Sequence, residues 1–332
     1  MTRDRPVTPD GPLLTVEGLR CRIATPAGTV RALDGVDLDL RRGEVLGLVG
    51  ESGSGKSMLV RSIMGIRPAR AEQDGRIVLD GADLTAMDAR AAHRLRGRRV
   101  GMVFQDPMTA LNPVVRIGRQ ITEVARRTLG LSAREARDRA VELLARAGIP
   151  EPAARLRHYP HQFSGGMRQR ITIAMALACD PDLLIADEAT TALDVTVQRQ
   201  ILDLLAGLQR DRGMAMILVS HDLGVVAGRA DRVAVMYAGR IVEQAPAADL
   251  FAARRHRYTE ALLGAVPRLD LPRHSRLRAV PGLPSDPTRD DPGCPFAPRC
   301  PRAGDRCRTE RPPLVEERPG HQHACFDPVE AT

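Results

Sequence analysis

The fold of this chain is decided by the stretch Gly50-Glu51-Ser52-Gly53-Ser54-Gly55-Lys56-Ser57. The stretch matches the pattern GxxxxGK(S/T), in which glycines let the backbone wrap closely around a phosphate that the loop N–H groups bind. The apolar residues 45–49 before it predict a buried strand, and residues 58–66 after it predict a helix whose positive end faces the phosphates. Lys56 would reach the β- and γ-phosphates, and the Ser57 hydroxyl would bind Mg²⁺. The context predicts a nucleotide-binding site rather than a glycine- and serine-rich turn with a stray lysine.

Lys56 is the only lysine in the chain, because every other basic residue apart from histidine is an arginine. An ammonium is a compact point charge, whereas a guanidinium is a planar fork. The single lysine therefore stands where a point charge suits the geometry of a phosphate loop.

The length of 332 residues and the 43% hydrophobic fraction allow one large α/β domain with an appendage, or two modest domains. The net charge of +8 would suit nucleic acid or an anionic membrane, but the arginines are scattered, and we interpret most of them as solvated. No signal peptide opens the chain and no apolar run could span a bilayer, so we expect a soluble protein in the compartment where ATP is made. There, the six cysteines indicate metal ligands or free thiols rather than disulfides.

Further strands are predicted to end in polar residues. Residues 100–104 form an apolar run that leads to Gln105, which could contact Mg²⁺ or the attacking water beside a phosphate loop. Residues 183–186 lead to Asp187 and Glu188, for which we predict Mg²⁺ binding through water and a general base, respectively. Taken alone, the glutamine would be an ordinary loop residue, and the two acids could cap the next helix.

Two more segments complete the set. Ser164-Gly165-Gly166-Met167 is predicted to begin a helix that runs to Ala178, with Ser164 as N-cap and backbone N–H groups free for an anion. Asp194 comes next in the chain. After it, the predicted strand 216–220 leads to His221. A serine cap or a strand-end histidine is more often structural, but in this order the histidine is predicted to contact the γ-phosphate.

These ordered motifs resemble the ATP-binding subunits of ABC transporters over roughly residues 13–265. The resemblance implies an α/β P-loop NTPase fold of ABC type with an antiparallel β subdomain, an inserted helical subdomain at about 107–178 and hydrolysis of ATP to ADP and phosphate with Mg²⁺. By the same resemblance Gly50–Ser57 is the Walker A loop, Gln105 the Q-loop residue, Ser164–Met167 the signature, Asp187 and Glu188 the Walker B pair, Asp194 the D-loop residue and His221 the switch histidine. The expected Mg²⁺ ligands are Ser57, Gln105 and Asp187.

Members of this family act as head-to-tail dimers, in which the Walker A loop of one subunit and the signature of the other enclose ATP. The resemblance therefore implies a second ATPase subunit, related but not identical, together with two transmembrane permease subunits and an extracytoplasmic substrate-binding protein. It places the chain peripherally, on the cytoplasmic face of the cell membrane. A DNA-repair member would carry a long coiled-coil insertion and a translation member two cassettes, so no nucleic-acid partner is expected.

Two segments resemble the branch that imports dipeptides and oligopeptides, residues 105–113 and 258–263, although Arg257 stands where that branch commonly has proline. The signature has Met167 where the general family usually has glutamine. A signature with methionine at this position is similar to the peptide-importer branch. The family stacks adenine on an aromatic residue, and here Ile23, with Arg22, would have to cover the base. The cargo could be a dipeptide, a longer peptide or a nickel chelate; a soluble ATPase acting on nucleic acid or ribosomes is the alternative.

The two ends of the chain are predicted to lie outside the ATPase domain. Residues 1–12 are expected to be a disordered lead-in, and residues 266–332 a C-terminal extension with a small core. The extension contains Cys294, Cys300, Cys307 and Cys325. It resembles extensions of certain dipeptide-importer ATPases that bind a four-iron, four-sulfur cluster (4Fe–4S). Zinc, with His321 and His323 as possible substitute ligands, and the absence of a metal are the alternatives.

Overall fold

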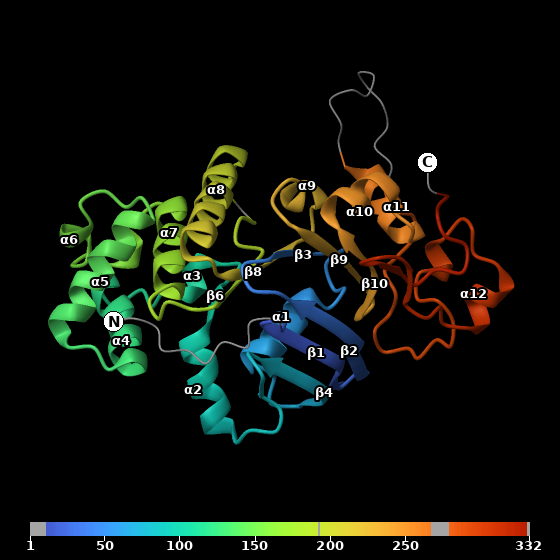
Figure 1. Ribbon diagram of the computed structural model, residues 1–332, viewed down its shortest axis with the longest axis horizontal. Helices are drawn as coiled ribbons and strands as arrows, with labels where there is room; N and C mark the ends of the chain where they lie inside the picture. Colours follow the sequence, from blue (N-terminus) through green and yellow to red (C-terminus); the bar gives the residue numbers. More distant parts are fainter. Residues whose placement is uncertain (1–10, 192, 267–278, 331–332) are drawn as a thin grey trace.

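The computed structural model describes residues 11–191, 193–266 and 279–330 (Figure 1). The predicted disordered lead-in falls almost entirely outside the described residues. Two sheets organise the rest. The larger has eight strands in the order β11-β12-β10-β9-β3-β8-β7-β6, and the smaller has four in the order β2-β1-β4-β5. This is the expected α/β fold with a separate antiparallel sheet.

The centre of the large sheet is parallel and buried on both faces. β3 pairs in parallel with β8 and β9, and β7 pairs in parallel with β8 and β6. Such strands read as continuous apolar runs, and the predicted runs are confirmed as strands. The strands of this sheet are β3 (Val45–Val49), β6 (Val100–Val103), β7 (Leu183–Asp187), β8 (Ala215–Ser220), β9 (Arg232–Tyr237), β10 (Arg240–Pro246), β11 (Val315–Arg318) and β12 (His321–His323).

The small sheet is antiparallel and packs beside the phosphate-loop helix. β1 (Leu14–Thr25) and β2 (Gly28–Leu40) form a hairpin, and β1 also pairs with β4 (Ala71–Leu79), which pairs with β5 (Ala82–Asp83). Buried residues of this sheet share one core with the apolar face of the helix α1 (Lys56–Met64). The phosphate loop therefore emerges between two sheets.

The helix α1 ends earlier than the predicted range of 58–66. Gly65 adopts φ = 68° and its N–H bonds back to the carbonyl groups of Arg61 and Ser62. A left-handed glycine is a common helix terminator, because it costs no Cβ clash there. Gly65 therefore ends the helix two residues before the predicted end at position 66.

Helices between β6 and β7 form the left-hand lobe of Figure 1. The predicted capping box is confirmed, since the Ser132 hydroxyl accepts from the N–H of Glu135 and the Glu135 carboxylate accepts from the N–H of Ser132. The lobe consists of α3 (Pro107–Ala110), α4 (Ile117–Leu129), α5 (Ala133–Arg146), α6 (Pro152–Arg155), η1 (Pro160–Gln162) and α7 (Gly165–Ala176). α7 stops two residues before the predicted end at Ala178. The helices outside the lobe and before residue 267 are α2 (Ala89–Arg99), α8 (Val195–Arg212), α9 (Leu223–Val226), α10 (Ala247–Ala253) and α11 (Arg257–Ala265).

The C-terminal tail, defined here as residues 279–330, is packed against the main core. It contains η2 (Ala297–Arg299), α12 (Asp305–Thr309), β11 and β12, and β12 pairs with β10 of the large sheet. Phe296 is 2% exposed and belongs to the main core cluster. The described tail contributes Phe296 and Ala324 as buried hydrophobic residues, and Phe296 packs into the core of the ATPase domain rather than into a core of the tail's own. No helix in the described part of the chain is long and apolar enough to cross a membrane.

Candidate functional site

The candidate site lies where neighbouring parallel strands end. β3 leads into the phosphate loop, β6 to Gln105, β7 to Asp187 and Glu188, and β8 to His221. Carboxyl ends of parallel strands meet at one edge of a sheet, and ligands of α/β proteins bind there. Polar residues from four separate segments are thus brought to one edge.

The phosphate loop has the backbone that its glycines predict. Gly53 and Gly55 have φ values of 82° and 106°, and a Cβ on Gly55 would lie 2.6 Å from the Ala32 carbonyl oxygen. The Lys56 ammonium donates to the carbonyl oxygens of Gly50 at 2.7 Å and Glu51 at 2.9 Å. Burial lowers the pKa of Lys56, because a charge loses its water there. The lysine is therefore aimed inward at its own loop.

Ser57 and Asp187 form the oxygen-rich part of the site. The Ser57 hydroxyl donates to the Asp187 carboxylate over 3.1 Å. Burial raises the pKa of Asp187, and the Ser57 hydrogen bond opposes that rise. A hydroxyl beside a buried carboxylate is a donor set that suits Mg²⁺, which prefers oxygen ligands and keeps several waters. These two residues fit the predicted cation.

Glu188 is the point on which the predicted catalytic residues converge. Its carboxylate accepts from the Gln105 amide at 3.0 Å, lies 3.4 Å from His221 Nδ1 and lies 3.8 Å from Lys56 Nζ. The Thr191 hydroxyl also donates to it at 3.2 Å. Sequence reasoning did not find Thr191, which no strand-end pattern marks. Glu188 has a positive φ of 46°, and it lines a cavity of about 200 Å³ together with His221.

The predicted signature residues lie on another part of the chain. Ser164 caps α7, its hydroxyl accepting from the N–H of Met167 at 3.4 Å, and Gly165 is the first residue of the helix. α7 belongs to the left-hand lobe in Figure 1, whereas the phosphate loop precedes α1 near the centre. Asp194 caps α8 by accepting from the Val197 N–H at 2.9 Å, and a Cβ on Gly166 would lie 2.9 Å from the Val197 side chain. The signature therefore packs on α8.

Ile23 and Arg22, which were predicted to cover adenine, lie on β1. Ile23 is half-buried and packs against the core that the small sheet shares with α1. Arg22 is exposed and forms an ion pair with Asp74 at 3.7 Å. Both are on the sheet that flanks the phosphate-loop helix.

The four tail cysteines line one cavity of about 20 Å³. All six cysteines are free thiols, and burial raises the pKa of Cys294 to about 11 and also raises the pKa of Cys300 and Cys325. Four converging thiols are a donor set for zinc or an iron–sulfur cluster, but the space is that of a single water molecule. In the described ranges, no group of three or more His, Cys, Asp or Glu could hold a metal ion as arranged. The four thiols thus share a cavity, but they are not arranged as a metal centre, and the predicted iron–sulfur or zinc site is not confirmed.

The two tail histidines, predicted as substitute zinc ligands, have other partners. His321 lies 2.8 Å from Glu243 and His323 lies 3.0 Å from Glu317. Both rings are buried, and both belong to β12 rather than to the cavity of the thiols. A carboxylate holds Nε2 of each ring, and neither histidine lines the cavity of the thiols, so their role as substitute zinc ligands stays a prediction.

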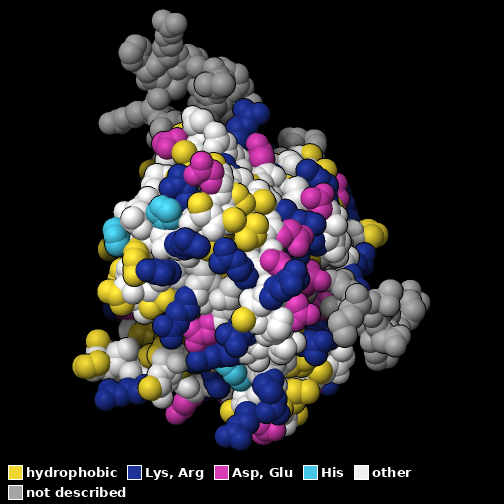
Figure 2. Space-filling view, turned by 90° about the vertical axis from the view of Figure 1, so that its left-hand side faces the viewer, with side chains coloured by type: hydrophobic (Ala, Val, Ile, Leu, Met, Phe, Trp, Pro, Cys, Tyr) yellow, Lys and Arg dark blue, Asp and Glu magenta, His cyan; other side chains and the backbone are white. Residues whose placement is uncertain are grey.

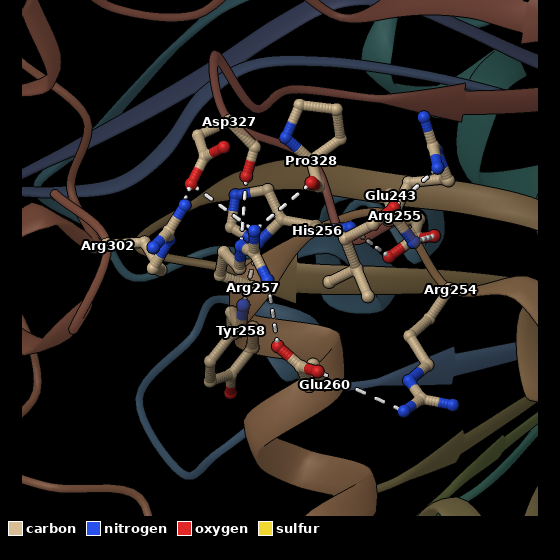
Figure 3. Close-up of polar contacts among 11 residues, drawn as sticks. Glu243, Arg254, Arg255, His256, Arg257, Tyr258, Glu260, Arg302, Asp327 and Pro328 are labelled. Carbon is tan, nitrogen blue, oxygen red and sulfur yellow. Dashed lines mark hydrogen bonds and ion pairs between the residues drawn. The ribbon is translucent and has the colours of Figure 1, made fainter. Parts of the chain in front are cut away.

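Arginines tie the tail to the start of α11 (Figure 3). Arg257, which stands where the importer branch commonly has proline, donates to the Asp327 carbonyl at 2.9 Å and to its carboxylate at 3.2 Å. Arg302 pairs with the same carboxylate at 3.1 Å. A proline could make none of these bonds, so the arginine adds a polar attachment for the tail.

The arginines elsewhere are distributed as the sequence predicts. On the face shown in Figure 2, basic side chains lie among acidic, hydrophobic and neutral ones. On the helical lobe, Arg127 pairs with Glu123 at 2.6 Å and Arg146 pairs with Glu142 at 3.0 Å. Ion pairs of this kind account for part of the basic charge.

The fold and the site define a P-loop ATPase of the ABC type. The sequence matches the ABC transporter family over residues 33–191, and the oligopeptide/dipeptide transporter C-terminal region over residues 242–307. It is 48% identical to the oligopeptide transport ATP-binding protein OppD of Salmonella typhimurium over 322 residues, covering 97% of this chain and 96% of that protein. It is also 48% identical to the dipeptide transport ATP-binding protein DppD of Bacillus subtilis over 316 residues, covering 95% and 94%.

A solved structure resembles the ATPase part. The ATP-binding cassette MJ0796, determined as a dimer in a post-hydrolysis state with ADP and Pi, superposes with a TM-score of 0.63 at 27% identity, covering 70% of this chain and 98% of that one. The chain belongs to the ABC transporter ATP-binding proteins, in the group that contains OppD and DppD. ABC ATP-binding subunits hydrolyse ATP to power transport, and this chain is an ATPase subunit of that kind.

Proposed function

We propose that the chain powers the import of dipeptides and oligopeptides by hydrolysing ATP. The convergence of Gln105, His221 and Lys56 on the Glu188 carboxylate carries the enzymatic half of this proposal. The relatedness to transport proteins for oligopeptides and dipeptides along almost the whole chain supports the cargo class.

In the proposed reaction, Glu188 is the general base that takes a proton from the attacking water. Gln105 and His221 orient that water and the γ-phosphate, since both already contact the Glu188 carboxylate. Lys56 moves from the carbonyl oxygens of its loop to the β- and γ-phosphates of ATP. The N–H groups of residues 50–57 hold the phosphates, and Ile23 with Arg22 covers the adenine.

Mg²⁺, when bound, neutralises charge on the phosphates. Ser57, Asp187 and Gln105 are the proposed ligands in this chain, with Asp187 acting through water. The Ser57 hydroxyl and the Asp187 carboxylate already lie within hydrogen-bond distance.

The signature segment Ser164–Met167 and Asp194 are proposed to act on the nucleotide of a second subunit. The signature begins a helix on another lobe from the phosphate loop, so a head-to-tail dimer would let the N–H groups at its start complete a phosphate site. The proposed partners are a related ATPase subunit, two permease subunits and a substrate-binding protein outside the membrane. In this proposal residues 13–265 form the ATPase domain, with the helical subdomain at 107–178, and the chain lies on the cytoplasmic face of the membrane.

The catalytic assignment is tested by Glu188→Gln. The amide keeps the shape of the side chain but cannot accept the proton, so turnover is expected to fall by about 10²–10⁴-fold with ATP binding retained. Steady-state hydrolysis and equilibrium ATP binding are measured on the same preparation. Turnover within a few-fold of the parent chain would remove Glu188 from this role.

The cargo is tested in vesicles that contain the permease pair and the second ATPase subunit. Uptake of labelled dipeptide that requires ATP, and stops with Glu188→Gln, is the expected result. Uptake of a nickel chelate but not of peptides would mean that the cargo is the chelate and not a peptide. ATPase stimulation by RNA or DNA without uptake would favour the soluble alternative.

We also propose that the four tail thiols bind a metal group, with a 4Fe–4S cluster preferred over zinc. The support is that all four thiols line one cavity and that burial raises the pKa of Cys294, Cys300 and Cys325, an effect that a bound cation would offset. The cavity would have to widen. Protein purified without oxygen is expected to carry iron and sulfide in equal amounts with a visible absorption band. Colourless zinc protein supports the alternative metal, and metal-free protein refutes the proposal.

A further inference from the structure

Glu51, the second residue of the phosphate loop, is held at three points. Its N–H donates to the Tyr258 hydroxyl at 2.8 Å. Its carbonyl oxygen accepts from Lys56 Nζ at 2.9 Å and from the Ser54 N–H at 3.2 Å. Its carboxylate accepts two hydrogen bonds from Arg299, at 2.6 and 3.0 Å. Every polar group of this residue therefore has a partner, and two of the partners lie outside the loop.

Arg299 reaches the loop from the C-terminal tail, where it is fixed on all sides. Its side chain is 3% exposed, and the remaining donors bond to the carbonyl oxygens of Pro281 at 2.7 Å and Val280 at 3.4 Å. It also lies 3.4 Å from the Tyr237 hydroxyl oxygen. A guanidinium bound at every edge has a single orientation, so it presents its fork to Glu51 in a fixed direction.

The aromatic residues around this arginine link the tail to α11 and β9. The rings of Tyr237 and Tyr258 are 4.6 Å apart, and Phe296 of the tail lies 5.3 Å from Tyr258 and 5.5 Å from Tyr237. The Tyr258 hydroxyl accepts from the Glu51 N–H, and the Tyr237 hydroxyl lies next to Arg299. The tail, α11 and β9 thus form one rigid support behind the phosphate loop.

We infer that Arg299 is a positioning residue for the phosphate loop, through which the C-terminal tail holds Glu51 in the conformation that binds ATP. The inference rests on the proposed ATP site and extends it to residues of the tail. A loop ordered before binding loses less conformational entropy when ATP arrives. The bidentate ion pair supplies that order, since it fixes both the place and the rotation of the Glu51 carboxylate.

The test is a double-mutant cycle in the full chain with Arg299→Gln, Glu51→Gln and the two together. Each single change is expected to weaken equilibrium ATP binding about tenfold, because one charge-assisted interaction is lost. The double variant is expected to bind no more weakly than the singles, since the same contact cannot be lost twice. In Arg299→Gln, turnover at saturating ATP should stay within about twofold, because Arg299 lies outside the proposed ATP site and the hydrolytic residues are untouched.

The matched control is Arg302→Gln, an arginine of the same tail whose side chain is 63% exposed and pairs with Asp327. It is expected to leave ATP affinity unchanged. If Arg299→Gln does not fold, Tyr258→Phe keeps the ring and removes only the acceptor of the Glu51 N–H, and about fivefold weaker binding is expected.

Two outcomes overturn the inference. One is a parent chain that binds ATP while every folded variant at positions 51, 258 and 299 binds it equally well. The other is a pair of losses that simply add in the double variant, as a general loosening of the tail would give. A parent chain that binds no ATP would instead refute the proposed function.

Discussion

The phosphate loop and the C-terminal tail meet at Glu51 and are built by different means. The loop uses backbone groups, glycines with positive φ and one buried ammonium, and its polar partners stand at the ends of adjacent strands. The tail uses buried aromatic rings and arginine ion pairs, and Arg299 lies 248 positions from the glutamate that it contacts. One region is organised around a ligand, and the other is organised around the core.

The difference indicates which property each region controls. Changes within the loop should alter ATP binding with little effect on stability, because its groups are arranged for phosphates. Changes within the tail should alter the free energy of unfolding first, because Phe296 of the tail belongs to the main core. Three changes test this division.

The largest expected effect is on stability, from Phe296→Ala in the tail. Removing a ring that is 2% exposed should lower the free energy of unfolding by about 3–5 kcal/mol, measured by urea denaturation. The control is Leu283→Ala, a tail side chain that is 87% exposed, for which the loss should stay below about 0.5 kcal/mol. Equal effects at the two positions would mean that the tail is not part of the core.

The second effect is a pH dependence that originates beside the tail. Burial lowers the pKa of His256 to about 4 from an ordinary value of 6.5, so the unfolded chain binds the proton more readily. The contribution of neutral His256 to the free energy of unfolding is fully present above pH 6.5. It is lost as the pH drops towards 4, and the loss is about 3 kcal/mol at most. His323, whose pKa burial also lowers, acts in the same direction.

The contribution of His256 is isolated by His256→Asn. An asparagine can still accept the Tyr258 N–H that the ring accepts at 3.0 Å, but it does not titrate. The variant should show a flatter stability profile between pH 6.5 and pH 4 in denaturation at several pH values. A profile as steep as that of the parent chain would assign the dependence to other groups.

The smallest expected effect is a change in the free energy of ATP binding, and it comes from a substitution in the phosphate loop. Lys56→Met removes the ammonium and should weaken ATP binding about a hundredfold, as measured by titration. The free energy of unfolding should change little, because burial already disfavours the charge of Lys56. Arg119→Met, at a side chain that is 77% exposed, serves as the charge-matched control. A large loss of stability in Lys56→Met would break the division between the two regions.

The loop could be predicted from the sequence because its pattern is local and its strand-end partners follow apolar runs. Ser57, Asp187, Gln105, Glu188 and His221 each stand next to a recognisable strand, so their meeting could be expected. Thr191 was missed, since a hydroxyl in a loop has no distinguishing neighbour.

The tail could not be predicted in the same way. Arg299 is one of many arginines, and nothing around Pro298-Arg299-Cys300 marks a partner in the phosphate loop. The tail has few apolar residues, which predicts a segment poor in core, and the sequence does not show that Phe296 packs into the core of the ATPase domain. The contact of His321 with Glu243 could not be predicted either, because the two residues are 78 positions apart in the sequence.

The pairing of β12 with β10 has a consequence for the order in which the protein is made. Chains begin to fold from the N-terminus while they are still being synthesised. The central parallel strands are complete once β9 has emerged, whereas β10 waits for His323 and Gln322 to pair with Glu243 and Gln244. Until then β10 presents an open sheet edge, through which unfinished chains can join one another. The last strands synthesised therefore cover the edge of β10, and a nascent chain that stalled before them would be prone to aggregate.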